Sequence, residues 1–382
     1  MTTLPASISV LEWAAQRADL DESTLTRKFP RWPEWIRGEA EPSARQLEDF
    51  SKKTHVPFGY FFLPEPPEEQ IPIPDYRTIS GNKVVRPSPA LLETVYAMQR
   101  RQAWMREDQM QAGIEPFEFV GSASVKEDAE AVGRELRRML GLNDGWAAQV
   151  RTWTAAVGEF RHAIEDLGVM AVVNGVVGNN THWKLEVEEF RGFALSDPYA
   201  PLIFVNGSDA KSAQMFTLAH ELAHIWLGES ALTDASAAPM KLGETETWCN
   251  QVAAECLVPR NEVKVLWRDL RHDEDPTSTL ARRFKVSPVV GARRLLDLGY
   301  WTRDQFFDFY DAYTREEKKR ASQRAGGGDF YNNQNTRVGE LFATRVLHAA
   351  MEGRMGYKEA YDLTGLQGGI FEKYARKLGV DL

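Results

Sequence analysis

Apolar side chains recur at helical spacing along the first part of the chain. Leu11 and Ala14 mark one helix, Ser43 opens a later one, and bulky side chains fill residues 56–63. We therefore expect a small helical domain over residues 1–64.

A proline-rich stretch and two long helical patterns follow. Five prolines lie within 64–75, and such a run is stiff and extended, which predicts a linker over 65–85. Helical spacing then runs over 88–111 and again over 125–141. These two patterns predict a helical connector over 86–145 that supports the part that follows.

The middle of the chain changes from helical spacing to short apolar runs. These runs predict strands over 168–174, 190–196 and 201–205. Two helices follow, one from near Ala210 through Leu227 and one over about 244–257, where Pro259 stops it. A few strands followed by two helices predict a compact α+β unit over 146–262.

The remainder of the chain returns to helical spacing. Leu280, Phe284 and Leu295 outline a helix-turn-helix-like unit over 263–324, and a glycine-rich break leads into a last helical piece over 325–382. The expected fold class is therefore α+β and mostly helical, with a small sheet-bearing unit flanked by helical domains.

Composition and charge narrow the functional classes. The 382 residues carry 46 Lys and Arg against 55 Asp and Glu, for a net charge of −9 at pH 7. An acidic chain does not coat nucleic acid non-specifically, because counterion release needs clustered basic side chains. We expect no membrane span and no signal peptide. The two cysteines, Cys249 and Cys256, make no disulfide scaffold, so we expect a reducing, cytoplasmic compartment.

The segment 220–224 reads His-Glu-Leu-Ala-His within a predicted helix. His220 and His224 are four residues apart, and helical residues at that spacing share a face, so both imidazoles can bind one metal ion. Glu221 can take a proton from a metal-bound water, whose pKa zinc lowers to about 7. A buried histidine pair without a metal would need other hydrogen-bond partners, so we expect a zinc site.

A catalytic zinc site needs a third protein ligand and an open fourth position. Our expected ligand is Glu246, on the next predicted helix. Asn250 lies four residues later on the same face, where it can hydrogen-bond the outer nitrogen of a ligand histidine. Glu244 and Cys249 stay open as alternative ligands.

Two segments together resemble the ImmA/IrrE family of metallo-endopeptidases. They are 216–224, which reads FTLAHELAH, and 246–259, which reads ETWCNQVAAECLVP. The upstream runs 191–195 and 203–206 are also similar, and the resemblance spans about 168–260. The pairing of the two segments is specific, whereas either alone is not.

The resemblance implies a zincin-like peptidase domain. It assigns His220, His224 and Glu246 as zinc ligands and Glu221 as the catalytic base. Members of the family characteristically cleave a helix-turn-helix repressor, so the resemblance implies a regulatory protein as substrate.

Residues 1–64 resemble a lambda-repressor-like (XRE-type) helix-turn-helix domain. Leu11 to Leu25 match the first two helices, and 35–39 match the turn after the recognition helix. The segment 29–34 departs from the pattern, because it is short and holds two prolines, which oppose a full recognition helix. Residues 1–63 carry eight basic and nine acidic side chains, whereas a DNA-docking face is normally basic. We expect a degenerate domain kept for protein contacts, and DNA binding is not favoured.

A second helix-turn-helix-like stretch over 280–295 carries four arginines. They are Arg282, Arg283, Arg293 and Arg294. These side chains could contact phosphates or form a solvated face. We favour a structural or substrate-positioning role for this stretch.

Two functional interpretations remain. The first is a soluble zinc endopeptidase that cuts a regulatory protein. The second is a transcriptional regulator or antitoxin-like binding protein with a non-catalytic zinc site. The intact Glu221 favours the first, since a structural site needs no base. The sequence does not choose the oxyanion-stabilising group among Tyr199, His182 and an arginine, and it does not indicate the oligomeric state.

Overall fold

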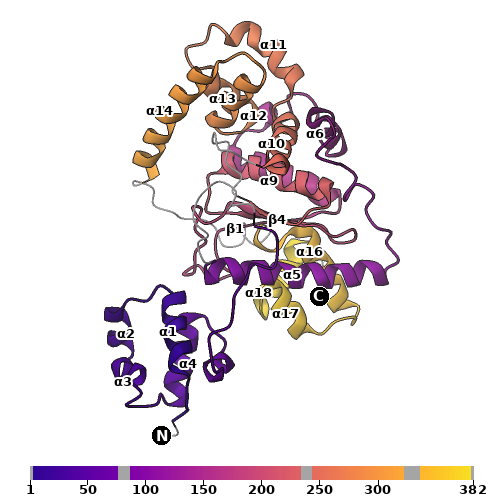
Figure 1. The fold of residues 1–382 in the computed structure, drawn as a ribbon. Coiled ribbons are helices and arrows are strands. Elements are labelled where there is room, and N and C mark those ends of the chain that lie inside the picture. The colour runs from indigo at the N-terminus through magenta and orange to yellow at the C-terminus, as the bar shows by residue number, and fades with distance from the viewer. Residues whose placement is uncertain (1–2, 76–86, 234–242, 322–335, 380–382) are drawn as a thin grey trace. The chain divides into compact units, whose positions relative to one another are not determined.

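A computed structural model describes residues 3–75, 87–233, 243–321 and 336–379 (Figure 1). The chain forms two compact units, residues 1–72 with 85–95 and residues 73–84 with 96–382. The sequence-based division into six segments is finer than these two units and stays a prediction.

The first unit is built from short helices around an aromatic core. Its elements are α1 (Ile8–Arg17), α2 (Glu22–Lys28), α3 (Trp32–Ile36), α4 (Ala44–Thr54) and the 3-10 helix η1 (Phe58–Phe62). Trp32 stacks on Phe50, and Trp35 and Phe61 are buried beside them. Such large aromatic side chains supply most of the apolar area that a domain this small can bury.

Helix α3 lies where the resemblance to a helix-turn-helix domain would require a recognition helix, and it has only five residues. Pro33 lies within its first turn, where proline is tolerated, and Pro30 precedes the helix. The expected absence of a full recognition helix is therefore confirmed. The expected turn at 35–39 is wrong in part, because Trp35 and Ile36 are helical and the helix ends at Ile36.

A four-stranded mixed sheet lies at the centre of the second unit. Its strands are β1 (Met170–Asn174), β2 (Gly192–Leu195), β3 (Leu202–Asn206) and β4 (Ala231–Thr233). The strand order is β1-β3-β2-β4, with β1 parallel to β3 and the other neighbours antiparallel. Three of these strands were predicted from their apolar runs. The edge strand β4 was not predicted, because three residues are too few to show a period.

Helices enclose this sheet. Those before and between the strands are α5 (Pro89–Gln111), α6 (Ala129–Met139), α7 (Trp146–Gln149), α8 (Trp153–Asp166) and α9 (Lys211–Leu227), and α10 (Glu244–Leu257) follows the last strand. Figure 1 shows α9 and α10 over one face of the sheet and α16 beyond the other. Both α9 and α10 begin and end close to the predicted positions. Gly228, with φ of 71°, ends α9 in the left-handed conformation that favours glycine.

The remaining helices complete the second unit. They are α11 (Arg260–Leu270), α12 (Pro276–Phe284), α13 (Pro288–Asp297), α14 (Arg303–Ala321), α16 (Glu340–Met351), α17 (Tyr357–Thr364) and α18 (Gly369–Lys377). Leu280, Phe284 and Leu295 share one buried apolar cluster with Leu218 and Leu222 of α9. Helices α12 and α13 therefore pack into the same core as the histidine-bearing helix. None of the described helices combines the length and apolar character that a membrane crossing requires.

Candidate metal centre and active site

Helix α9 carries both histidines of the motif on one buried face. His220 and His224 are fully buried, and their Nε2 atoms lie 3.2 Å apart. The flanking Leu218, Leu222 and Ile225 belong to the main core, which keeps the helix in place. Because the two histidines are four residues apart on one helix, their Nε2 atoms lie close together, as the sequence predicted.

Helix α10 brings the Glu246 carboxylate to the same point. Its Oε2 lies 3.2 Å from His220 Nε2, and its Oε1 lies 3.1 Å from His224 Nε2. Together with the nitrogen–nitrogen distance, these separations are close to the tetrahedral edge of about 3.3 Å that follows from zinc–ligand bonds of about 2.0 Å. These three side chains form the cluster, within the described residues, that could hold a metal ion.

Asn250 supports the cluster from the next turn of α10. Its Oδ1 lies 3.0 Å from His220 Nδ1, the nitrogen that faces away from Glu246. When Nδ1 carries the proton and donates to this oxygen, the lone pair of Nε2 points toward the cluster. The structure thus places Asn250 where the sequence predicted it.

Glu221 lies beside the cluster and is fully buried. Its Oε1 accepts a short hydrogen bond from the hydroxyl of Thr233 on β4. Its Oε2 is buried and accepts no hydrogen bond from the described residues. Burial, which outweighs the attraction of His220, raises the pKa of Glu221 to about 8. One oxygen of this carboxyl group is held in place, and the other has no protein partner among those residues.

The cluster is electrostatically asymmetric. Burial opposes the charged form of Glu246, but the two histidines outweigh it and hold its pKa well below the usual range. Burial also lowers the pKa of His224, while attraction to Glu246 outweighs burial and raises the pKa of His220. An ionised carboxylate beside two imidazole nitrogens is a donor set that suits a divalent metal ion.

The structure separates the alternative ligands from the cluster. Glu244 is exposed in the first turn of α10 and is not part of the cluster. Cys249 is buried among core side chains, and burial raises the pKa of its thiol well above the ordinary value. A thiol in that state is a small apolar core group, so Glu246 is the better candidate for third ligand.

Two residues that shape the site were missed by sequence reasoning. One is Thr233, which contacts Glu221 from the unpredicted strand β4. The other is Gly192 on β2, where an added Cβ would lie 2.8 Å from Glu221 Oε1 and 2.9 Å from the carbonyl oxygen of Phe204. No pattern in the neighbouring sequence marks either residue. Both contacts arise only when β2 and β4 pack against α9.

The structure does not supply an oxyanion-stabilising group from the named candidates. His182 is exposed and Tyr199 is half-buried. Both residues donate hydrogen bonds from their backbone amides, His182 to Asn180 and Tyr199 to Asp197. Within the described residues neither side chain forms a hydrogen bond with His220, His224 or Glu246, and the oxyanion-stabilising group stays open.

Arg294 has a structural role, the interpretation favoured from the sequence, and is not part of a solvated face. Its side chain is 3% exposed, forms an ion pair with buried Glu255, and donates from Nε to the carbonyl oxygen of Val258 at 2.9 Å. These contacts link α13 to Glu255 of α10 and to Val258, the residue that follows that helix. Arg293 instead bonds Asp297 at 2.9 Å on the surface.

Comparison with known families agrees with this geometry. Residues 182–296 match the model of the Peptidase_M78 family, the IrrE N-terminal-like domain. Residues 338–377 match a domain of unknown function, DUF8813. No curated protein matches the chain. The first match supports the resemblance to the ImmA/IrrE family and indicates a metallopeptidase-type function with a metal cofactor. Neither match reaches residues 1–64, so a helix-turn-helix domain there stays a prediction.

Proposed function

We propose that the chain is a zinc-dependent endopeptidase whose substrate is a helix-turn-helix repressor or a similar regulatory protein. The observation that supports it best is the convergence of His220, His224 and Glu246, with Glu221 held beside them and not among them. A structural zinc site normally has four protein ligands, whereas a catalytic site has three and an open position. Three ligands with an adjacent carboxyl group match the catalytic type.

Each side chain has a defined part in peptide hydrolysis. His220, His224 and Glu246 would hold the zinc ion, which when bound would polarise the scissile carbonyl group and acidify water. Glu221 Oε2 would accept the proton of the attacking water and pass it to the leaving amine. Burial raises the pKa of this carboxyl group, which makes its carboxylate a stronger proton acceptor than an exposed one. Thr233 orients Glu221 through Oε1 and leaves Oε2 for this exchange.

Separate observations support the proposed substrate class and compartment. The family match and the paired segments 216–224 and 246–259 favour a regulatory protein substrate. Both cysteines are buried and unpaired, which agrees with a reducing, cytoplasmic compartment. The five-residue helix α3 argues against DNA as the main partner.

Substitution of the base provides the decisive experiment. Glu221→Gln keeps the shape of the side chain but removes its ability to take a proton. We expect unchanged zinc content by elemental analysis and a loss of cleavage of about a hundredfold or more, the range that general base catalysis contributes. The substrate would be a purified helix-turn-helix repressor, with cleavage followed by mass spectrometry.

Matched variants separate metal loss from base loss. Glu246→Ala should lose both zinc and activity, whereas Glu244→Ala, an exposed position on the same helix, should retain both. Full cleavage by Glu221→Gln would contradict the proposal. In that case a group other than Glu221 would have to act as the base. No cleavage by the zinc-loaded wild type would instead favour a metal-binding regulator without hydrolytic activity.

A further inference from the structure

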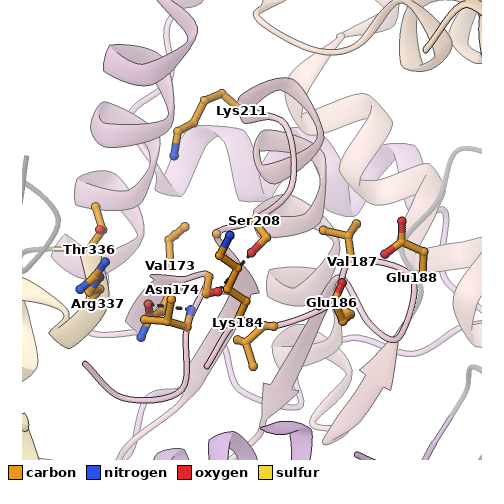
Figure 2. Close-up of a pocket in the computed structure, with 14 residues that line it drawn as sticks. Val173, Asn174, Lys184, Glu186, Val187, Glu188, Ser208, Lys211, Thr336 and Arg337 are labelled. Carbon is orange, nitrogen blue, oxygen red and sulfur yellow. Dashed lines mark hydrogen bonds between the residues drawn. The ribbon is translucent and has the colours of Figure 1, made fainter. Parts of the chain in front are cut away.

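A cleft lies beside Lys211, the first residue of α9, at the opposite end of that helix from the metal cluster of His220, His224 and Glu246. It has a volume of about 480 Å³ and forms where the parallel strands β1 and β3 end (Figure 2). The turn after β1, the turn after β3 and the segment 184–188 line it, together with Thr336 and Arg337. The carboxyl ends of parallel strands are the common place for ligand sites in α/β folds.

Two glycine turns form the base of this cleft. An added Cβ at Gly175 would lie 2.7 Å from the backbone nitrogen of Ser208, and one at Gly207 would lie 2.7 Å from the backbone nitrogen of Gly175. The two turns can approach this closely only without side chains. Ser208 joins them by donating from Oγ to the carbonyl oxygen of Gly175 at 3.1 Å.

Three basic side chains from separate segments line the cleft. They are Lys184, Lys211 and Arg337. Within the described residues none of them forms an ion pair with a carboxylate. Lys211 Nζ lies 3.0 Å from the amide oxygen of Gln214, and Arg337 Nη1 is buried without a hydrogen-bond partner there.

Two of these cations are partly removed from water. Burial lowers the pKa of both Lys211 and Arg337. A buried charge without a counter-charge costs free energy, which a bound anion would offset. Lys211 is also the first residue of α9, whose N-cap residue Ala210 makes no side-chain cap, and a helix N-terminus favours negative charge.

Two acidic side chains also line the cleft. Glu186 and Glu188 are exposed. Figure 2 shows Glu188 at one end of the cleft and Arg337 at the other, with Lys211 reaching in from above. The apolar Val173 and Val176 line the space between, so the cleft has a cationic end and an apolar wall.

We propose that this cleft binds a small phosphorylated anion, with Lys211 and Arg337 as its main contacts and Lys184 at the rim. A phosphoryl group carries close to two negative charges and several acceptor oxygens, so it can satisfy two cations at once. The volume leaves room for an organic part against the valines. The ligand would join α9, which carries the metal cluster, to Arg337, which directly precedes the segment 338–377.

Calorimetric titration of the full chain tests this site. The probes are inorganic pyrophosphate and ADP, without added divalent metal and at constant ionic strength. We expect saturable binding of at least one probe and a loss of affinity of about tenfold or more in both Lys211→Gln and Arg337→Gln, as charge-assisted hydrogen bonds predict. Lys184→Gln, at an exposed position where misfolding is not expected, should weaken binding to a smaller extent.

Two controls make the result specific. Lys264→Gln removes an exposed lysine of α11 that lies outside the cleft and should leave affinity unchanged. His224→Ala disrupts the metal cluster and should also leave it unchanged. The proposal is overturned if neither probe binds saturably, or if binding survives the substitutions of Lys184, Lys211 and Arg337. Binding that is lost only in His224→Ala would also overturn it, because the probe would then contact the metal cluster.

Discussion

At the scale of single residues, the sequence predicted the groups that local periodicity places together. His220 and His224 meet because they are four apart on one helix, and Asn250 meets His220 because it shares a face with Glu246. Thr233 could not be predicted, because its contact with Glu221 crosses from a three-residue edge strand to a helix. The spacing of residues in the sequence predicts which side chains are neighbours on one helix. It does not predict which residues of the sheet contact that helix.

Gly192→Ala tests whether the close approach of β2 to Glu221 matters for function. The new Cβ would lie 2.7 Å from Thr217 Cγ2 and 2.8 Å from Glu221 Oε1, with the backbone of Phe204 preventing retreat. We expect Glu221 to be displaced and the turnover number to fall about tenfold or more, because catalytic groups tolerate little misplacement. Zinc content should stay at the wild-type value, since Gly192 does not contact the ligands.

The measurement is steady-state cleavage alongside elemental analysis of the same preparation. Gly59→Ala is the matched control, because a Cβ there has no atom within 4 Å. Wild-type turnover in Gly192→Ala would show that Glu221 can move without loss and would remove Gly192 from the positioning residues.

At the scale of elements, the sequence predicted where helices begin and end better than it predicted which helices pack together. The pattern at 125–141 and the one at 244–257 correspond to α6 and α10, but nothing in either pattern indicates that these two helices pack together. In the same way, the sequence did not identify the partner of Arg294, whose side chain pairs with Glu255 of α10. Periodicity identifies the buried face of a helix, whereas the identity of the covering element depends on tertiary packing.

Gly133 marks the crossing of α6 and α10 and yields a test of that packing. An added Cβ would lie 2.7 Å from Glu255 Cβ and 2.8 Å from the carbonyl oxygen of Val252. Alanine normally favours a helix over glycine by about 1 kcal/mol. Here we expect the opposite sign, a loss of roughly 1–3 kcal/mol in the free energy of unfolding, because overpacking forces the helices apart.

Chemical denaturation of Gly133→Ala measures this loss. Gly158→Ala on α8 is the comparison, because it also lies within a helix but a Cβ there has no atom within 4 Å. We expect that variant to match or exceed the wild type in stability. Equal stability of the two variants would mean that α6 and α10 do not approach as closely as described.

At the scale of the whole molecule, buried polar side chains hold the C-terminal helices to the rest of the second unit. Arg101 of α5 donates to the carbonyl oxygens of Leu363 and Arg337 at 3.0 and 3.1 Å. Asp108 of the same helix pairs with Arg345 at 2.8 Å. Glu165 at the end of α8 accepts from the backbone nitrogen of Glu340 at 2.9 Å. The sequence showed these residues only as ordinary charges, because their partners lie more than a hundred positions away.

Glu165 gives this attachment a pH dependence. Burial outweighs the attraction of Arg161 and raises the pKa of Glu165 from 4.5 to about 7. The folded state therefore binds the proton more tightly than the unfolded state. The stability that this proton contributes is fully present below about pH 4.5 and is lost as the pH rises through about 7.

Glu165→Gln keeps an acceptor oxygen near Glu340 but cannot titrate, so it isolates this effect. We expect the free energy of unfolding of the wild type, relative to Glu165→Gln, to fall between pH 4.5 and 7.5 by up to roughly 3 kcal/mol, since each pKa unit corresponds to about 1.4 kcal/mol. Other titrating groups cancel in the difference between the two proteins. Glu359→Gln, at an exposed position on α17, should give a curve parallel to the wild type. A parallel curve for Glu165→Gln as well would mean that Glu165 stays ionised throughout, and that its contacts with Arg161 and the first turn of α16 outweigh burial.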